Sequence, residues 1–184
     1  MTPIVDLAGK RGLVVGIANE NSIAYGCARA FRAAGADLAL TYLNAKAEPY
    51  VRPLADALKA SIVVPCDVRI AGELEAVFER IATEWGRLDF LFHSIAFAPR
   101  EDLHTGLVNC SAEGFAMAMD VSCHSFIRMA KLALPLMTKG GSLQTVSFYG
   151  ADRVVENYNL MGPVKAALES TVRTLAAEIG RAHV

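Results

Sequence analysis

The sequence predicts an α/β protein in which one doubly wound parallel sheet lies between two layers of helices, a three-layer α/β/α arrangement. Short β-branched or aliphatic runs alternate with longer stretches of helical period, which is the pattern of βαβ units around a parallel sheet. The 184 residues, 53% of them hydrophobic, fit one domain that buries about 70% of its unfolded surface. No linker, repeat or low-complexity tract interrupts residues 1–184, so we predict a single domain.

Five strands are expected, because each run is short, apolar and bounded by turn residues. They are residues 12–15, 37–42, 61–66, 88–94 and 142–147. The stretches between and after them predict helices, at residues 22–34, 45–58, 72–85, 113–137 and 161–180. The helices at 113–137 and 161–180 are apolar on almost every face. Because one sheet cannot cover such helices, we expect a homo-oligomer that forms through them.

Composition and charge argue against several classes of function. The 18 Lys plus Arg residues and 19 Asp plus Glu residues give a formal charge of −1, without blocks of either sign, which disfavours nucleic-acid binding and a membrane surface. The longest apolar runs, 36–43 and 90–98, fall far short of the ~20 residues of a membrane span. The N-terminus lacks the pattern of a secretory signal, so we expect a cytoplasmic protein. The four cysteines are widely spaced and are interpreted as free thiols.

The first predicted strand ends in a turn that suits a phosphate. In parallel sheets, ligands bind outside the carboxyl ends of the strands where the strand order reverses. The strand is followed by the run from Gly16 to Gly26, which begins Gly16-Ile17-Ala18-Asn19 and enters the next predicted helix. A glycine turn at this place directs backbone N–H groups at a pyrophosphate. Ser22 suits the N-cap of that helix. The spacing differs from G-x-G-x-x-G, but its place in the first βα turn favours a Rossmann-like dinucleotide site over a plain turn.

The residues at the ends of the second, third and fourth strands do not decide between NADH and NADPH. Residues 41–44, Thr-Tyr-Leu-Asn, lack the acid that is usual in NAD sites, and Lys46 follows shortly after. Asp67 could accept a hydrogen bond from an adenine amino group or cap the next turn, two roles with equal support. The fourth strand ends in Ser94-Ile95-Ala96, small residues beside which a ribose can approach the backbone. His93 has no second ligand at metal spacing, so we interpret it as a packed strand histidine and predict no metal site.

The strongest local signal is the run from Tyr158 to Lys165, two residues that lie seven positions apart in the sequence. On a helix this interval is nearly two turns, about 10 Å along the axis, which leaves room for a ribose between them. The lysine ammonium is expected to hold sugar hydroxyls and to favour the phenolate of the tyrosine. Because proline is tolerated only in the first turn of a helix, Pro163 places Tyr158 at the helix entrance.

These residues together carry a family resemblance. The chain resembles the short-chain dehydrogenases/reductases and, more closely, the enoyl-acyl-carrier-protein reductases of bacterial fatty acid synthesis. The Tyr-x6-Lys interval is similar to that of the enoyl reductases, whereas the general dehydrogenases of the superfamily use Tyr-x3-Lys. The resemblance covers essentially the whole chain and rests on residues 16–26, 93–99, 150–152, 157–162 and 165–166.

The resemblance implies an activity and a role for each matching residue. A hydride passes from a nicotinamide to the β-carbon of a trans-2-enoyl thioester held by acyl carrier protein, and an enolate forms on the thioester oxygen. Tyr158 is implied to stabilise that oxygen, and Lys165 to bind the nicotinamide ribose. The implied cofactor contacts are Gly16, Ala18, Ser22, Ile23, Leu43, Asp67, Val68, Ser94, Ile95 and Ala96. NADH is the expected cofactor, with NADPH as the alternative, because neither Leu43 nor Asn44 is the arginine that clamps a 2′-phosphate.

The sequence departs from the family pattern at several positions. Phe148 stands where the family has a second tyrosine, and the hydroxyl follows one residue later in Tyr149, the third catalytic candidate. Ala96 occupies a position that is commonly glycine, and Leu43 one that is often a polar cofactor reader. Family members continue after the long helix with two further strands and a substrate-binding segment, so we expect the fold to lack those strands and to expose a sheet edge prone to association.

Two other functions compete with this interpretation. A carbonyl or alcohol dehydrogenase of the same superfamily needs a hydroxyl on the fifth strand, which Thr145 or Ser147 could supply. The Tyr–Lys interval argues against that alternative. A non-catalytic chain that only binds nucleotide is the third possibility, which a titration with NADH followed by an enoyl assay separates from the first two.

Overall fold

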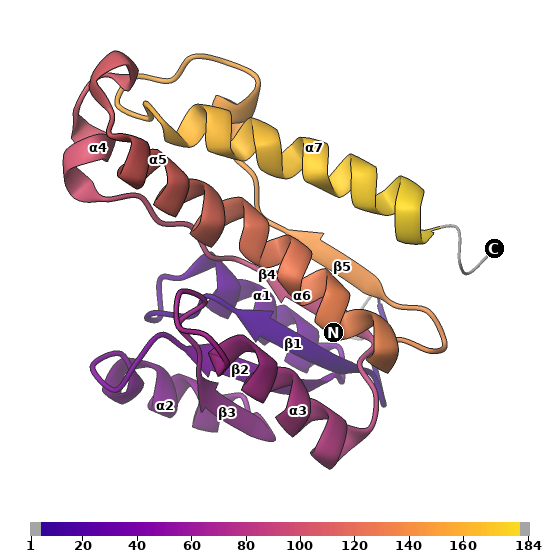
Figure 1. The fold of residues 1–184 in the computed structure, drawn as a ribbon. Helices are drawn as coiled ribbons and strands as arrows, with labels where there is room; N and C mark the ends of the chain where they lie inside the picture. The colour runs from indigo at the N-terminus through magenta and orange to yellow at the C-terminus, as the bar shows by residue number, and fades with distance from the viewer. Residues whose placement is uncertain (1–4, 181–184) are drawn as a thin grey trace. The chain divides into compact units, whose positions relative to one another are not determined.

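The computed structural model describes residues 5–180, and it confirms the predicted α/β architecture (Figure 1). Residues 181–184, at the chain end where two further strands were expected to be missing, lie outside the described residues. In chain order the main elements are β1 (Arg11–Val15), α1 (Ile23–Ala33), β2 (Asp37–Tyr42), α2 (Glu48–Ala57), β3 (Ile62–Pro65), α3 (Glu73–Trp85), β4 (Phe90–His93), α4 (Arg100–His104), α5 (Ala112–Met119), α6 (Ser125–Ala133), β5 (Ser142–Thr145) and α7 (Met161–Ile179).

The chain forms two compact units. The sheet unit comprises Met1–Ser94 and Ala130–Thr145, and the helical unit comprises Ile95–Met129 and Val146–Val184. All five strands belong to the sheet unit, whereas α4, α5 and α7 belong to the helical unit. That residues 1–184 act as a single domain stays a prediction.

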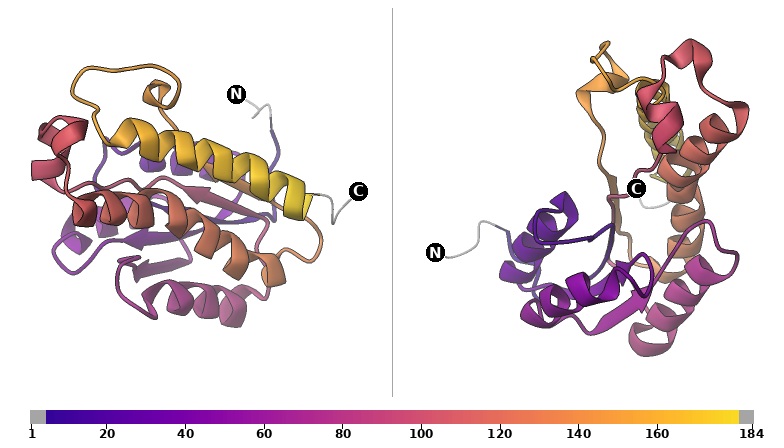
Figure 2. Two further views of the ribbon diagram at one scale, coloured as in Figure 1. Left: turned by 45° about the horizontal axis from the view of Figure 1, so that its top comes forward. Right: turned by 90° about the vertical axis from the view of Figure 1, so that its left-hand side faces the viewer.

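The sheet unit is built on five parallel strands in the order β3-β2-β1-β4-β5. The chain runs outward from β1 to β3 and then crosses back to β4, so the strand order reverses between β1 and β4. Ligands of doubly wound sheets bind at such a reversal. Figure 2 shows α1 and α3 on opposite faces of the sheet. Because helices cover both faces, the central strands are nearly continuous apolar runs, with Leu13, Leu38, Leu40 and Leu91 fully buried.

The predicted helix at 113–137 is confirmed as one helical stretch from Ala112 to Leu136 (Figure 1), but it is not a regular α-helix throughout. The structure divides it into α5, a π-helical turn at Asp120–His124, α6 and a short 3-10 turn at Leu134–Leu136. Pro135 lies in the 3-10 turn, where its missing N–H ends the regular helix. Much of the apolar surface of this stretch is covered within one chain, because Val121, Phe126 and Met129 are buried.

The helical unit has a core of its own. Ala118 of α5 packs with Leu160, Met161 and Val164 at the start of α7 in a buried cluster, and Leu103 of α4 contacts its margin. The short helix α4, absent from the sequence prediction, therefore rests on the same core as the start of α7. Within residues 5–180, no helix is long and apolar enough to cross a membrane.

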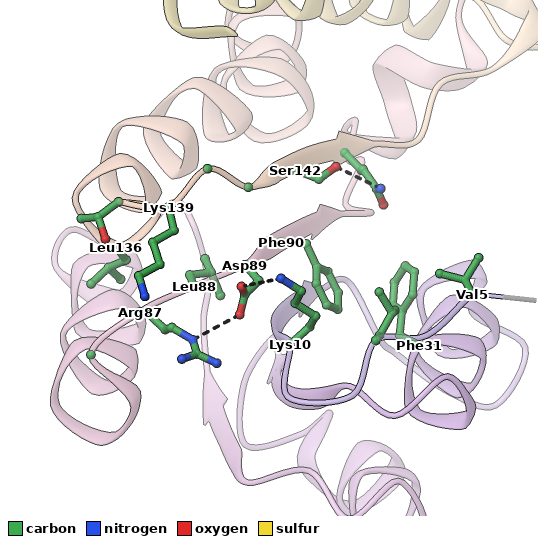
Figure 3. Close-up of a pocket in the computed structure, with 16 residues that line it drawn as sticks. Val5, Lys10, Phe31, Arg87, Leu88, Asp89, Phe90, Leu136, Lys139 and Ser142 are labelled. Atoms are coloured by element: carbon green, nitrogen blue, oxygen red, sulfur yellow. Dashed lines mark hydrogen bonds and ion pairs between the residues drawn. The ribbon is translucent and has the colours of Figure 1, made fainter. Parts of the chain in front are cut away.

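A cavity of about 790 Å³ lies in the sheet unit near the starts of β4 and β5 (Figure 3). Its walls include the rings of Phe31 and Phe90, which lie 4.9 Å apart between centroids. Asp89 lies at the rim, where its carboxylate pairs with Lys10 at 3.5 Å and Arg87 at 3.4 Å. None of the predicted site residues lines this cavity, which therefore takes no part in the candidate site.

Candidate active site

The first βα turn has the geometry of an anion site. Gly16 has φ 115°, a left-handed conformation that favours glycine. Ser22 occupies the N-cap position of α1 as predicted, but its side chain makes no capping hydrogen bond. Its Oγ instead accepts hydrogen bonds from the backbone N–H groups of Ala18 and Asn19, both at 3.0 Å. The serine thus shapes the turn and leaves the first N–H groups of α1 free of a side-chain cap, which suits a pyrophosphate.

Three predicted cofactor contacts lie near the ends of β1 and β2 with accessible side chains. Ala18 is exposed, as are Ile23 and Leu43, whose exposed fractions are 62% and 49%. The neighbouring Asn44 is engaged locally, because its Oδ1 accepts hydrogen bonds from the N–H groups of Lys46 at 3.0 Å and Ala47 at 3.2 Å. The stretch before α2 is therefore a formed turn that presents Leu43 outward.

Asp67 takes the turn-forming role that the sequence left open. Its carboxylate accepts hydrogen bonds from the backbone N–H of Arg69 at 3.0 Å and from the guanidinium of the same residue at 2.6 and 2.9 Å. This arginine lowers the pKa of the Asp67 carboxyl, although burial acts in the opposite direction. Val68 beside it is buried. Contact of Asp67 and Val68 with an adenine stays a prediction.

The end of β4 confirms the interpretation of His93 as a packed strand residue. The imidazole is fully buried, and its Nδ1 lies 2.8 Å from Oγ1 of Thr145 on β5. Among residues 5–180, no group of three or more His, Cys, Asp or Glu side chains could hold a metal ion. The next residue, Ser94, donates its backbone N–H to the carbonyl oxygen of Val15 at 2.9 Å. Ser94, a predicted ribose contact, therefore lies at the carboxyl ends of β1 and β4.

In the helical unit, the loop after β4 is held by a serine that the sequence analysis missed. The hydroxyl of Ser122 accepts a hydrogen bond from the N–H of Phe97 at 2.9 Å and lies 3.1 Å from the carbonyl oxygen of the same residue, to which it donates. Ser122 is fully buried in the π-helical turn. It thereby fixes the backbone just after Ile95 and Ala96, two of the predicted cofactor contacts.

Lys165 lies on the first turns of α7 and is 5% exposed. Its Nζ donates a hydrogen bond to the carbonyl oxygen of Val146 at 2.7 Å. Burial lowers the pKa of Lys165, and the nearby Cys123 thiol acts in the opposite direction. A buried ammonium with one described hydrogen bond has donors left for sugar hydroxyls, so Lys165 fits the nicotinamide ribose that the resemblance implies.

Tyr158 precedes α7 by three residues and lies in a turn, so the two-turn helical spacing predicted for the Tyr–Lys pair is wrong. Its placement at the helix entrance is confirmed, with Pro163 in the first turn of α7. The ring packs against Phe148, with centroids 4.6 Å apart, and an ideal Cβ at Gly150 would overlap it. Burial raises the pKa of Tyr158, which corrects the expected phenolate and keeps the hydroxyl protonated at neutral pH.

Tyr149, the other catalytic candidate, begins a short 3-10 turn at Tyr149–Ala151 and is 66% exposed. The aromatic ring that packs against Tyr158 is that of Phe148. A catalytic role for Tyr149 therefore stays a prediction. Asn157 and Asn159, on either side of Tyr158, were not predicted from the sequence, although asparagine is the residue after glycine that most readily adopts left-handed turns.

The chain is similar to proteins of a known family. A family model described as "Enoyl-(Acyl carrier protein) reductase" matches residues 16–184. The chain belongs to this family. It is 47% identical over 176 residues to the NADH enoyl-[acyl-carrier-protein] reductase FabI of Aquifex aeolicus, which covers 95% of this chain and 65% of the relative. The FabI of a Nostoc species is 45% identical, with 98% of this chain and 71% of that protein covered.

Solved structures of the family share the fold. The enoyl reductase of Anaplasma phagocytophilum in complex with NAD has a TM-score of 0.93 and 43% identity, covering 98% of this chain and 70% of that one. The Bacillus cereus enoyl reductase with NADP+ and an indole naphthyridinone has a TM-score of 0.94 and 43% identity, with 98% and 71% covered. The chain thus spans about two thirds of the length of these family members.

Proposed function

We propose that the chain acts as an enoyl-acyl-carrier-protein reductase in fatty acid biosynthesis, reducing the trans-2 double bond of acyl-carrier-protein-bound enoyl thioesters with NADH. The observation that carries the proposal is the pair at the start of α7, a partly buried neutral tyrosine and a buried lysine, in a chain of the enoyl reductase family. The related enzymes named as NADH reductases support NADH.

The residues divide the work between holding the cofactor and stabilising charge. When bound, NADH supplies the hydride. Lys165 donates hydrogen bonds to the ribose, and the turn from Gly16 to Ile23 supplies backbone N–H groups to the phosphates. Tyr158 keeps its proton at neutral pH because burial raises its pKa. It can therefore donate a hydrogen bond to the thioester oxygen as negative charge develops there, the interaction that lowers a barrier of this kind most effectively.

The ketone-reducing alternative has less support, since both hydroxyls proposed for it are engaged. Thr145 pairs with His93, and the hydroxyl of Ser147 donates to Glu169 at 2.5 Å. An assay with crotonyl thioester and a panel of ketones, each with NADH and with NADPH, tests the choice. We expect oxidation of NADH by the enoyl thioester at a rate above that of NADPH. Turnover of ketones alone would overturn the proposal, and NADH binding without turnover favours the non-catalytic alternative.

We also propose a cytoplasmic homo-oligomer that forms through residues 113–137 and 161–180. Support comes from apolar side chains that one chain leaves accessible on the first of these stretches, Met117, Ile127 and Leu134, which are 37–38% exposed. We expect at least a dimer by light scattering at low micromolar concentration. A monodisperse monomer would show that these faces need no partner.

A further inference from the structure

The turn that carries Tyr158 has an unusual backbone. Asn157 has φ 63° and Asn159 has φ 39°, so the residues on both sides of the tyrosine are left-handed. This conformation is unfavourable for most residues with a side chain, and asparagine is among the few that adopt it readily. Such backbone persists only where surrounding contacts determine it, and it concentrates at functional sites.

The two asparagines differ in their side-chain contacts. The amide Nδ2 of Asn159 donates a hydrogen bond to the carbonyl oxygen of Leu103 at 2.6 Å, 56 residues away in sequence. Asn157 is exposed, and its side chain makes no hydrogen bond within residues 5–180. One asparagine therefore ties the tyrosine turn to another element, whereas its neighbour supplies only the backbone conformation.

The acceptor of this bond belongs to a well-fixed segment of the helical unit. Leu103 lies in α4 and packs against the buried cluster at the start of α7. The segment is held before α4 by the two hydrogen bonds between Ser122 and Phe97. It is held at α4 itself by the buried Asp102, whose carboxylate accepts the N–H of Ser111 at 2.5 Å. The carbonyl of Leu103 thus belongs to a segment that several contacts hold in place.

We propose that Asn159 is a positioning residue for Tyr158. Its bond to Leu103 fixes the tyrosine turn against the segment that begins with Ile95 and Ala96, the predicted cofactor contacts, and so sets the place of the phenolic oxygen. Phe148 and Gly150 confine the ring from the side, and the turn makes local backbone hydrogen bonds such as that of the Tyr158 N–H to Val155 at 3.2 Å. The side-chain bond of Asn159 adds the connection from this turn to α4. The effect on catalysis rests on the proposed function, because it requires Tyr158 to act in the reaction.

The test compares glycine substitutions on the two sides of Tyr158, of which only one removes the hydrogen bond to Leu103. Asn159→Gly keeps a residue that accepts positive φ and removes the amide, and Asn157→Gly makes the same change on the other side of Tyr158. We expect Asn159→Gly to lower kcat at least about tenfold, since small misplacement of a reacting group has effects of this size, with the Kd of NADH within twofold of wild type. Asn157→Gly is expected to keep kcat within twofold.

A second readout does not depend on turnover. The Tyr158 resonance of protein labelled with 13C-tyrosine, assigned from a Tyr158→Phe spectrum, reports the pKa of the phenol. In Asn159→Gly we expect this pKa to fall toward the ordinary tyrosine value, because a loosened turn exposes the ring, while Asn157→Gly titrates like wild type. Asn159→Asp retains the preference for left-handed backbone but presents an acceptor, not a donor, to the Leu103 carbonyl. We expect it to show the same loss of kcat and the same fall in the Tyr158 pKa as Asn159→Gly. It replaces the glycine variant in the test if that variant fails to fold.

Two results would overturn the proposal. One is an Asn159→Gly protein with wild-type kcat and a wild-type titration, and the other is equal losses in both glycine variants. Absence of enoyl turnover in the wild-type protein would overturn the proposed function instead. The titration would then still decide whether Asn159 positions Tyr158.

Discussion

Replacing Tyr158 with phenylalanine is expected to lower kcat for an enoyl thioester about 100- to 1000-fold, the effect of removing one hydrogen-bond donor from a developing oxyanion. The Kd of NADH should stay within twofold, because the proposed cofactor contacts lie on other residues. The fold should also persist, since the ring contact with Phe148 at 4.6 Å does not need the hydroxyl. Stopped-flow turnover and NADH fluorescence titration measure the two quantities separately.

Two further tyrosine variants make this result specific. Tyr50→Phe removes a hydroxyl from a 68% exposed side chain on α2 and is expected to change neither quantity. Tyr149→Phe tests the second tyrosine of the family pattern, and we expect a loss smaller than that of Tyr158→Phe because Tyr149 is 66% exposed. A Tyr158→Phe enzyme within twofold of wild-type kcat would show that the phenol does not stabilise the oxyanion.

Replacing Lys165 with methionine is expected to weaken NADH binding and to lower kcat/KM, each about 10- to 100-fold, because hydrogen bonds from a charged group are worth about 1.5–3 kcal/mol. The fold should persist, because methionine is an apolar side chain of similar length at a buried position. NADH titration and steady-state kinetics measure the two losses, and urea unfolding checks that the variant is folded.

The lowered pKa of Lys165 determines how NADH affinity is expected to depend on pH. The ammonium is the form that binds sugar hydroxyls, and it is present below its pKa. Since that pKa is lowered, NADH affinity should fall on the alkaline side at a lower pH than the titration of an exposed lysine, and Lys165→Met should abolish this dependence. Lys131→Met, an exposed change on α6, is the matched control. Unchanged NADH affinity in Lys165→Met would rule out its ribose contact.

The sequence predicted what depends on periodicity. Residues 37–42 were predicted as a strand and form β2 with the same bounds, because six consecutive residues with an apolar interior and turns on both sides fit a buried parallel strand. The helical stretch at 113–137 was predicted as well, but its π-helical turn at Asp120–His124 was not, because such a turn changes the hydrogen bonding without changing the apolar pattern. Nothing in local periodicity marks it.

At the candidate site, residue types were easier to predict than their partners. Tyr158 and Lys165 were proposed as site residues from their spacing. The bond of Lys165 to the Val146 carbonyl and that of Asn159 to Leu103 were not predicted, because they join segments 19 and 56 residues apart. Ser22 was placed at the right position with the wrong bond, because a serine hydroxyl can accept from either side of a helix start. Such choices depend on tertiary geometry.

The contacts of the Tyr158 ring restrict movement of the ring but not rotation of its hydroxyl proton. With Phe148 on one side and no room for a side chain at Gly150, the ring cannot swing without disturbing its neighbours. The hydroxyl proton, in contrast, rotates about the bond between Cζ and the oxygen. The phenol can therefore turn its proton from one acceptor to another while its oxygen stays in place, so that redirecting the hydrogen bond requires no rearrangement of the protein.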